Sequence, residues 1–95
     1  MSTTWDEPKR LANLAKHGLD FADFDTCFDG ETALVLPARP SRTGRSRYQL
    51  IGHWTGGRVV VVIVSPLGTE KLSLVSLRIA DPDEREDYAR YRAEA

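Results

Sequence analysis

The 95-residue sequence has one cysteine and no long hydrophobic run. A single thiol, Cys27, can form neither an internal disulfide nor a structural zinc site. The longest purely aliphatic run, residues 59–64, is far shorter than the roughly 20 residues that cross a bilayer. The segment MSTTWDEPKR at the N-terminus carries acidic residues and no apolar core, unlike a signal peptide. These absences predict one cytoplasmic domain, residues 1–95, that makes no membrane contact.

Acidic residues are missing from the middle third of the chain. Residues 32–69 contain no aspartate or glutamate, whereas acids outnumber bases on both sides of that segment. The formal net charge of −1 therefore hides a strongly cationic region. Its basic residues are Arg39, Arg42, Arg45, Arg47 and Arg58. This uncompensated charge predicts an anionic partner, and a solvated arginine loop is the alternative.

The segment after Asp6 has the start and stop signals of a short helix. Asp6 is a candidate N-cap, Pro8 suits the first turn, and Gly18 suits the left-handed position beyond the last turn. The expected apolar stripe is Leu11, Leu14 and Ala15. The expected polar side is Lys9, Asn13, Lys16 and His17. The sequence thus predicts one amphipathic helix with a cationic side.

A second short helix is predicted after Asp20, which can cap it. Apolar residues then repeat at near-helical spacing. They are Phe21, Phe24, Cys27 and Phe28. We interpret them as core residues and expect a buried, inert thiol at Cys27.

Four strands are predicted next, over residues 32–36, 47–54, 58–65 and 70–79. A loop rich in proline and arginine, residues 37–46, separates the first two, and we expect it to be mobile. The other connections are short turns, which favour antiparallel pairing. The unbroken aliphatic run in the third strand predicts a central position, buried on both faces. One face of the 47–54 strand should carry Tyr48, Leu50 and Trp54.

The chain ends with a predicted helix that has a strong start signal. Asp81 and Glu84 form an Asp-x-x-Glu capping box, with Pro82 at the first helical position. Beyond Ala80 the helix has little apolar surface apart from Tyr88 and Tyr91. We therefore expect it to dock weakly on its own or to be completed by a partner. The predicted fold is α+β, with two short N-terminal helices, a four-stranded antiparallel sheet and a C-terminal helix.

The candidate chemistry is limited by what the side chains offer. His17 and His53 have no second ligand at metal-binding spacing, and neither a nucleophilic triad nor a phosphate-binding glycine loop is present. What remains is a set of cations, tyrosines and histidines. Arginine and lysine can stabilise charge on a pentacoordinate phosphate while a lysine, histidine, tyrosine or glutamate transfers protons. This set is compatible with phosphodiester cleavage without a metal.

The N-terminal region carries a specific motif. Residues 5–21 contain W-D-x-x-K-x-x-x-N-x-x-K-H-G-x-x-F, which strongly resembles the opening motif of the BrnT family. The resemblance continues along nearly the whole chain, in order and at family spacing. It includes Phe28-Asp29, Arg47, Ile51-Gly52, Ser76, Arg78, Ala80, Glu84-Arg85 and Tyr88. The family consists of small ribonuclease toxins of type II toxin–antitoxin modules, built on a RelE-like fold.

This resemblance implies an activity and its partners. The family toxin degrades RNA and blocks translation, with no cofactor or metal expected. A BrnA-type antitoxin neutralises it and carries the DNA-binding domain, so contact with operator DNA would occur only through the antitoxin. A hetero-oligomer with the antitoxin is therefore expected.

The same resemblance supplies candidate site residues. We interpret Arg47 and Arg78 as phosphate clamps and Lys16 as an electrostatic or proton-transfer group. The remaining candidates are Arg85, Tyr88 and His17. His17 has an alternative role as a cap of the last helical carbonyls, and Glu84 needs no role beyond capping. We expect His53 to be structural or solvent-facing.

The sequence departs from the family in its last strand, which usually reads I-R-I-I-S-A-R-K-A. Here the inner arginine is Ser73, the alanine is Leu77 and the lysine is Ile79. We expect two cations to be lost and two bulky apolar groups to be gained beside the site, which would weaken RNA binding. The protein is then either an active metal-independent endoribonuclease or a catalytically weak binding subunit or co-repressor. An unrelated RNA-binding domain is disfavoured, since no aromatic pair lies on adjacent strands.

Overall fold

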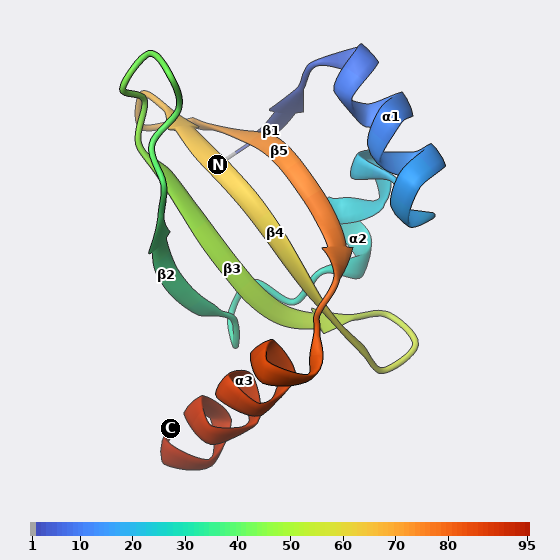
Figure 1. Cartoon of the computed structure of the whole chain (residues 1–95), viewed down its shortest axis with the longest axis vertical. Helices are drawn as coiled ribbons and strands as arrows, with labels where there is room; N and C mark the ends of the chain where they lie inside the picture. The colour runs from blue at the N-terminus through green and yellow to red at the C-terminus, as the bar shows by residue number, and fades with distance from the viewer. Residues whose placement is uncertain (1) are drawn as a thin grey trace.

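The computed structural model describes residues 2–95 and contains one mixed five-stranded sheet, ordered β1-β5-β4-β3-β2 (Figure 1). The strands are β1 (Ser2–Trp5), β2 (Leu34–Ala38), β3 (Arg47–Trp54), β4 (Arg58–Leu67) and β5 (Lys71–Ile79). The helices are α1 (Glu7–His17), the 3-10 turn η1 (Phe21–Asp23), α2 (Phe24–Cys27) and α3 (Pro82–Glu94). Within residues 2–95, every helix is too short or too polar to cross a membrane.

The prediction of a four-stranded antiparallel sheet is wrong in one respect. The N-terminal residues form β1, which pairs in parallel with β5, from Ser2 opposite Lys71 to Trp5 opposite Leu74. Four residues are too few to show a strand periodicity, and their partner lies almost seventy residues further along the chain. The other three pairings, β2–β3, β3–β4 and β4–β5, are antiparallel as expected.

The predicted element boundaries also shift. The predicted 32–36 strand is found at Leu34–Ala38 and includes Pro37. Strand β2 lies at the edge of the sheet, where a residue without a backbone N–H is tolerated because one side of the strand has no neighbouring strand to hydrogen-bond. The third strand continues to Leu67, and the fourth begins at Lys71. The predicted second helix is split into a 3-10 turn and a single α-helical turn, with Asp20 accepting from the Ala22 backbone N–H at 2.9 Å.

The larger core lies between the sheet and the segment that contains η1 and α2. As predicted, β4 is buried on both faces, with Val60, Val62 and Val64 in this core and Val61 on the opposite face. The other buried members of the larger core are Leu19, Phe21, Phe24, Trp54, Leu74 and Leu77. Phe28 and Cys27 pack at the margin of this core and are only partly buried, so the expectation of a buried thiol at Cys27 is wrong.

The smaller core lies under α3 on the other face of the sheet. Tyr88 is 3% exposed and packs with Ile51, Val61 and Ala80, whereas Tyr91 remains exposed. The predicted capping box is present, since Asp81 accepts from the Glu84 backbone N–H at 2.8 Å and Glu84 accepts from the Asp81 backbone N–H at 2.9 Å. Helix α3 is thus anchored mainly by its first turn and one aromatic ring, in line with the limited docking predicted for it.

Helix α1 is oriented opposite to what its amphipathic pattern suggests. Leu11 is 54% exposed and Leu14 is also exposed, whereas Asn13 is only 8% exposed. The Asn13 Nδ2 donates to the Leu77 carbonyl at 2.8 Å and to the Leu19 carbonyl at 3.1 Å, and its Oδ1 accepts from the Leu77 N–H at 3.0 Å. Asn13 does lie on the same side as Lys9, Lys16 and His17, as predicted, but this side faces the sheet and the Asn13 amide is buried. Its amide is buried because it satisfies backbone groups on β5 that β1 does not reach.

This orientation predicts an inverted pattern of stability along α1. Asn13→Ala leaves buried backbone groups at Leu77 and Leu19 without partners and should lower the free energy of unfolding by about 3 kcal/mol. Leu11→Ala, on the same helix, should change it by less than about 0.5 kcal/mol, because the side chain is already exposed. Urea denaturation of both variants measures this. A larger loss in Leu11→Ala than in Asn13→Ala would contradict the observed orientation.

Candidate RNA-binding groove

A bulge in β5 shapes the open face of the sheet. The register places Ser76 opposite Ile63 and Leu74 opposite Val64, so Val75 is an extra residue in the ladder. Such a bulge lets two neighbouring side chains lie on nearly the same face. Val75 and Ser76 accordingly both border surface hollows beside α1, while Leu74 and Leu77 both enter the larger core. The spacing of leucines at 72, 74 and 77 is the signal in the sequence that could have revealed this shift.

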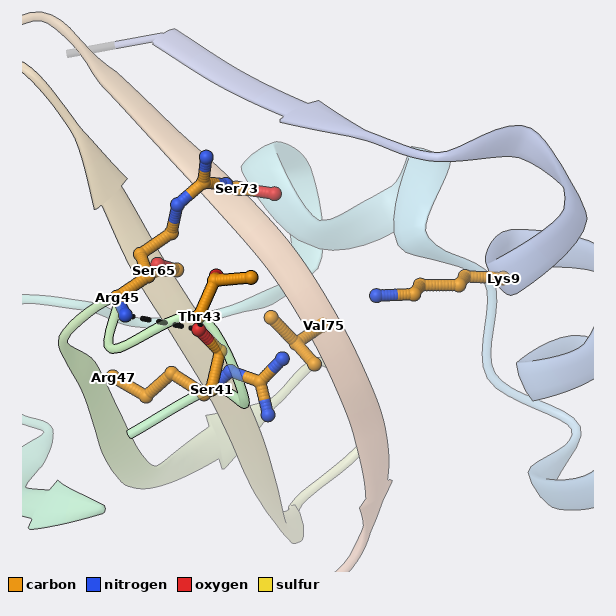
Figure 2. A pocket seen from close by; sticks show the side chains of 8 residues that line it. All are labelled: Lys9, Ser41, Thr43, Arg45, Arg47, Ser65, Ser73 and Val75. Atoms are coloured by element: carbon orange, nitrogen blue, oxygen red, sulfur yellow. Dashed lines mark hydrogen bonds between the residues drawn. The ribbon is translucent and has the colours of Figure 1, made fainter. Parts of the chain in front are cut away.

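A cationic groove lies on this face, between the 39–47 loop and α1. Figure 2 shows Lys9 extending from α1 toward β5, with Arg45 and Arg47 on the other side. The hollow between them has a volume of about 250 Å³. The residues that line it are Lys9, Ser41, Thr43, Arg45, Arg47, Ser65, Ser73 and Val75. No acidic residue is among these described lining residues, so the groove combines positive charge with hydroxyl groups.

Two neighbouring hollows extend the groove at both ends. One shares Arg47, Ser41 and Thr43 with it and adds Arg39 and Arg42 from the loop. The other shares Lys9 and Val75 and adds further residues of α1 and β5. These are Ala12, Asn13, Lys16, His17 and Ser76. The predicted residues Arg47, Lys16 and His17 therefore border one continuous series of hollows.

Hydrogen bonds hold the 39–47 loop over the sheet. The Ser41 Oγ accepts from the Arg45 backbone N–H at 2.9 Å, a contact drawn in Figure 2, and the Ser41 carbonyl accepts from the Gly44 N–H at 2.9 Å. Gly44 adopts a φ of +83°, which a residue with a side chain rarely adopts. The Ser65 Oγ on β4 donates to the Ser46 carbonyl at 2.8 Å. These hydrogen bonds fix the loop in a conformation that places Arg45 and Arg47 at the groove.

Arg47 lies at the start of β3, where the loop joins the sheet. Its Nε atom is buried and forms no hydrogen bond within the described part of the chain. A buried guanidinium N–H without an acceptor is costly unless a ligand supplies one. Arg47 is thus well placed to bind an anion that enters the groove.

Arg78 occupies a different environment. Its Nη1 and Nη2 donate to Glu84 Oε1 and Oε2 at 2.7 and 2.8 Å, forming a bidentate ion pair. The Gln49 side-chain amide also donates to Glu84 Oε2, at 3.0 Å. The Arg78 guanidinium lowers the pKa of Glu84, and Glu84 in turn raises the pKa of Arg78. Arg78 and Gln49 lie on the same face as Arg47, but the charge of Arg78 is already paired.

Other predicted site residues lie outside the groove. The Arg85 Nη1 donates to the Ala80 carbonyl at 2.9 Å, close to the start of α3. Tyr88 is buried in the smaller core, and its hydroxyl lies 3.4 Å from Thr32 Oγ1. His53 is exposed and packs edge-on against Tyr88, with ring centroids 5.1 Å apart. The structure brings neither Arg85 nor Tyr88 to the groove, and catalytic roles for both stay predictions. His53, expected to be structural or solvent-facing, also lies outside the groove.

The departures from the family in β5 fall on opposite faces of the sheet. Ser73 lines the groove, so the arginine that the resemblance leads us to expect here would have added a cation to it. Leu77 is fully buried in the larger core, and Ile79 pairs with Val60, whose side chain belongs to that same core. The expectation that two bulky groups intrude beside the site is therefore wrong. Strand alternation sends these side chains away from the face that carries Arg78.

One groove residue could have been found in the sequence. Lys9 precedes Lys16 by seven residues, or two helical turns, so both side chains lie on one side of α1. Their shared position beside Val75 confirms that side as cationic. Arg45 had no comparable signal, because loop residues have no periodicity that fixes their direction.

Comparison with known proteins identifies the family of the chain. Residues 5–84 match a family described as the ribonuclease toxin, BrnT, of type II toxin–antitoxin systems. The chain therefore belongs to the BrnT family of ribonuclease toxins. The crystal structure of the Brucella abortus ribonuclease toxin BrnT is similar, with 42% sequence identity and a TM-score of 0.69 over 85% of this chain and 97% of that one. Curated protein sequences gave no significant match.

The environment of Arg47 predicts that its charge does not stabilise the free protein. Arg47→Met removes a buried N–H without a partner and relieves repulsion among the cations of the groove. The free energy of unfolding should stay unchanged or rise by up to about 1 kcal/mol. Arg58→Met, at the distant β3–β4 hairpin, is the matched control and should stay within about 0.5 kcal/mol of the starting protein. Thermal and urea unfolding test this, and a clear loss of stability confined to Arg47→Met would disprove it.

Proposed function

We propose that this protein is an active endoribonuclease toxin that cleaves RNA without a metal ion. The observation that carries the proposal is the groove lined by Lys9, Arg45 and Arg47, in which none of the described lining residues is acidic. A phosphodiester is the anion that a ribonuclease must hold, and its charge increases in the transition state. Fixed guanidinium and ammonium groups supply the compensating charge.

The proposed reaction uses the neighbouring 2′-hydroxyl of the RNA. Its oxygen attacks the phosphorus while its proton passes to a base, and the 5′-oxygen leaves as it receives a proton. The products are a 2′,3′-cyclic phosphate and a 5′-hydroxyl end. Arg47 would bind the non-bridging phosphate oxygens, and Lys16 or His17 at the α1 end of the groove would transfer a proton.

The ends of the groove would bind the RNA on both sides of the scissile phosphate. Arg39 and Arg42 border the hollow beyond Arg47, and Lys9 borders both the main hollow and the one that contains Lys16. The cations are thus distributed along the groove rather than clustered at one point. We infer that the 39–47 loop holds flanking phosphates.

We further propose that cleavage inhibits translation and that a BrnA-type antitoxin neutralises the toxin. Membership of a toxin–antitoxin family supports an antitoxin partner. A hetero-oligomer would form in the cytoplasm, and operator DNA would be bound only through the antitoxin. The exposed Leu11 and Leu14 on α1 and Tyr91 on α3 show that apolar surface is available to a partner.

A second candidate function is favoured by two features of β5. Arg78 is neutralised by Glu84, and Ser73 stands where the family usually has an arginine. A toxin homologue with less effective positive charge could serve mainly as a binding subunit or co-repressor with its DNA-binding antitoxin. This alternative differs from the first in catalytic rate, not in fold.

Cleavage in the presence of chelator is the direct test of the proposed activity. The purified, partner-free protein should cleave labelled RNA in excess EDTA and leave cyclic phosphate ends. The Arg47→Ala/Arg78→Ala double variant should lose at least about a hundredfold in rate, because it removes two charged groups from the phosphate-binding face. This variant also controls for contaminating nucleases. Equal RNA stability with the folded wild type and the double variant would favour the binding-subunit function.

Ser73 and Ile79 lie on opposite faces of the sheet, so adding a cation at each position should affect RNA affinity differently. Ser73→Arg should tighten binding to a 2′-O-methyl RNA and steepen the plot of log affinity against log salt by about 0.7 per phosphate contacted. Ile79→Lys adds the same charge on the opposite face and should have a much smaller effect. Fluorescence anisotropy at several salt concentrations measures both. Equal effects of the two substitutions would show that RNA does not bind specifically in the groove.

A further inference from the structure

Glu84 joins three elements at the edge of the open face. It belongs to the first turn of α3, and its side chain, 15% exposed, receives hydrogen bonds from Arg78 on β5 and Gln49 on β3. The backbone N–H of Asp81 donates to the same carboxylate. We propose that Glu84 is a positioning residue that orients the Arg78 guanidinium on the open face of the sheet, where it would bind an RNA phosphate beside the groove. This inference rests on the ribonuclease function proposed above.

The carboxylate of Glu84 is held in place by groups other than Arg78. Its Oε1 accepts from the Asp81 N–H at 2.9 Å and its Oε2 accepts from Gln49 Nε2 at 3.0 Å. One of these donors is backbone at a helix N-terminus, and the other extends from a strand. The direction of the carboxylate is therefore set before Arg78 binds it, as an orienting group requires.

The hydrogen bonds described for Arg78 use only part of its guanidinium: Nη1 and Nη2 donate to Glu84, and Nη1 also lies 3.4 Å from the Ile79 carbonyl. Both terminal nitrogens of Arg78 face Glu84, so the pair uses one N–H of Nη1 and one of Nη2. Guanidinium has five N–H groups in a planar fork, and this arrangement leaves the Nε–H and the outer N–H of Nη2 side by side. Two parallel donors match two oxygens of a phosphate. Glu84 thus fixes the plane in which Arg78 can receive its ligand.

A role for Glu84 as the general base is disfavoured by the same contacts. Four hydrogen bonds saturate both oxygens, and the bond from Arg78 is the main cause of its lowered pKa. A carboxylate so stabilised is a poor proton acceptor. A role as a latch that blocks Arg78 is also disfavoured, because the hydrogen bonds described for Arg78 leave its Nε–H and outer Nη2 N–H free to donate while Glu84 stays in place.

Steady-state cleavage by Glu84→Gln tests the positioning role. Glutamine preserves the cap, because its oxygen can still accept from Asp81, but it places an amide N–H₂ against a guanidinium donor. We expect kcat to fall about tenfold or more as Arg78 loses its orientation. KM should fall or stay unchanged, because the charge that neutralises Arg78 is gone. A loss of folded protein alone would lower apparent kcat in proportion to the unfolded fraction.

Asp81→Ala is the matched control. It removes the other half of the capping box and destabilises α3 to a similar or greater degree, but it leaves the backbone N–H of residue 81 and the Arg78–Glu84 pair in place. Its kcat, corrected for the folded fraction, should equal that of the wild type. An equal loss in Asp81→Ala would assign the effect of Glu84 to helix capping and overturn the proposal.

A double-substitution cycle shows whether Glu84 acts through Arg78. In an Arg78→Lys background, Glu84→Gln should cause little further loss, because the bidentate pair no longer exists. Additive losses would overturn the positioning role. If the wild type cleaves RNA and Glu84→Gln cleaves equally well, only this inference fails. If the wild type cleaves no RNA, the proposed ribonuclease function itself fails.

Discussion

The side-chain amide of Asn13 takes the place of a strand along the edge of β5. Strand β1 ends opposite Leu74, and three residues further on Asn13 both accepts from and donates to the backbone of Leu77. This contact attaches α1 to the sheet through its polar side. Because α1 is attached in this way, Lys9 and Lys16 border the open face instead of pointing into solvent on the far side. The cationic character of the groove thus depends on one buried amide.

The two faces of the sheet divide stability and function between them. One face packs against the segment from Leu19 to Phe28 and contains the larger core. The other is covered by α3 at one end only, where Tyr88 closes the smaller core. The uncovered end carries Arg47, and its buried Nε has no partner among residues 2–95. A surface that binds anions must leave such groups unsatisfied until the ligand arrives, at some cost in stability.

Arg47 and Arg78 share a face but differ in their electrostatic state. Arg47 lies among other cations, whereas Arg78 is held by Glu84 in a bidentate pair. The first arrangement favours attraction of the RNA backbone, and the second favours precise orientation of one guanidinium. Ser73 places a hydroxyl rather than a charge on the groove, while Leu77 and Ile79 belong to the opposite face of the sheet.

Four properties can be recognised from the order of the amino acids: the family, the central position of β4, the α3 capping box and the cationic middle segment. Each of these depends on local spacing, on an unbroken aliphatic run or on the absence of acids, all of which are visible along the chain. The three-dimensional packing decided that β1 joins the sheet and that Asn13 is buried while Leu11 is exposed. It also decided that Glu84 pairs with Arg78 across the start of α3. These outcomes depend on hydrogen bonds between groups distant in sequence or across a turn, and neither hydropathy nor spacing records which backbone groups still need a partner.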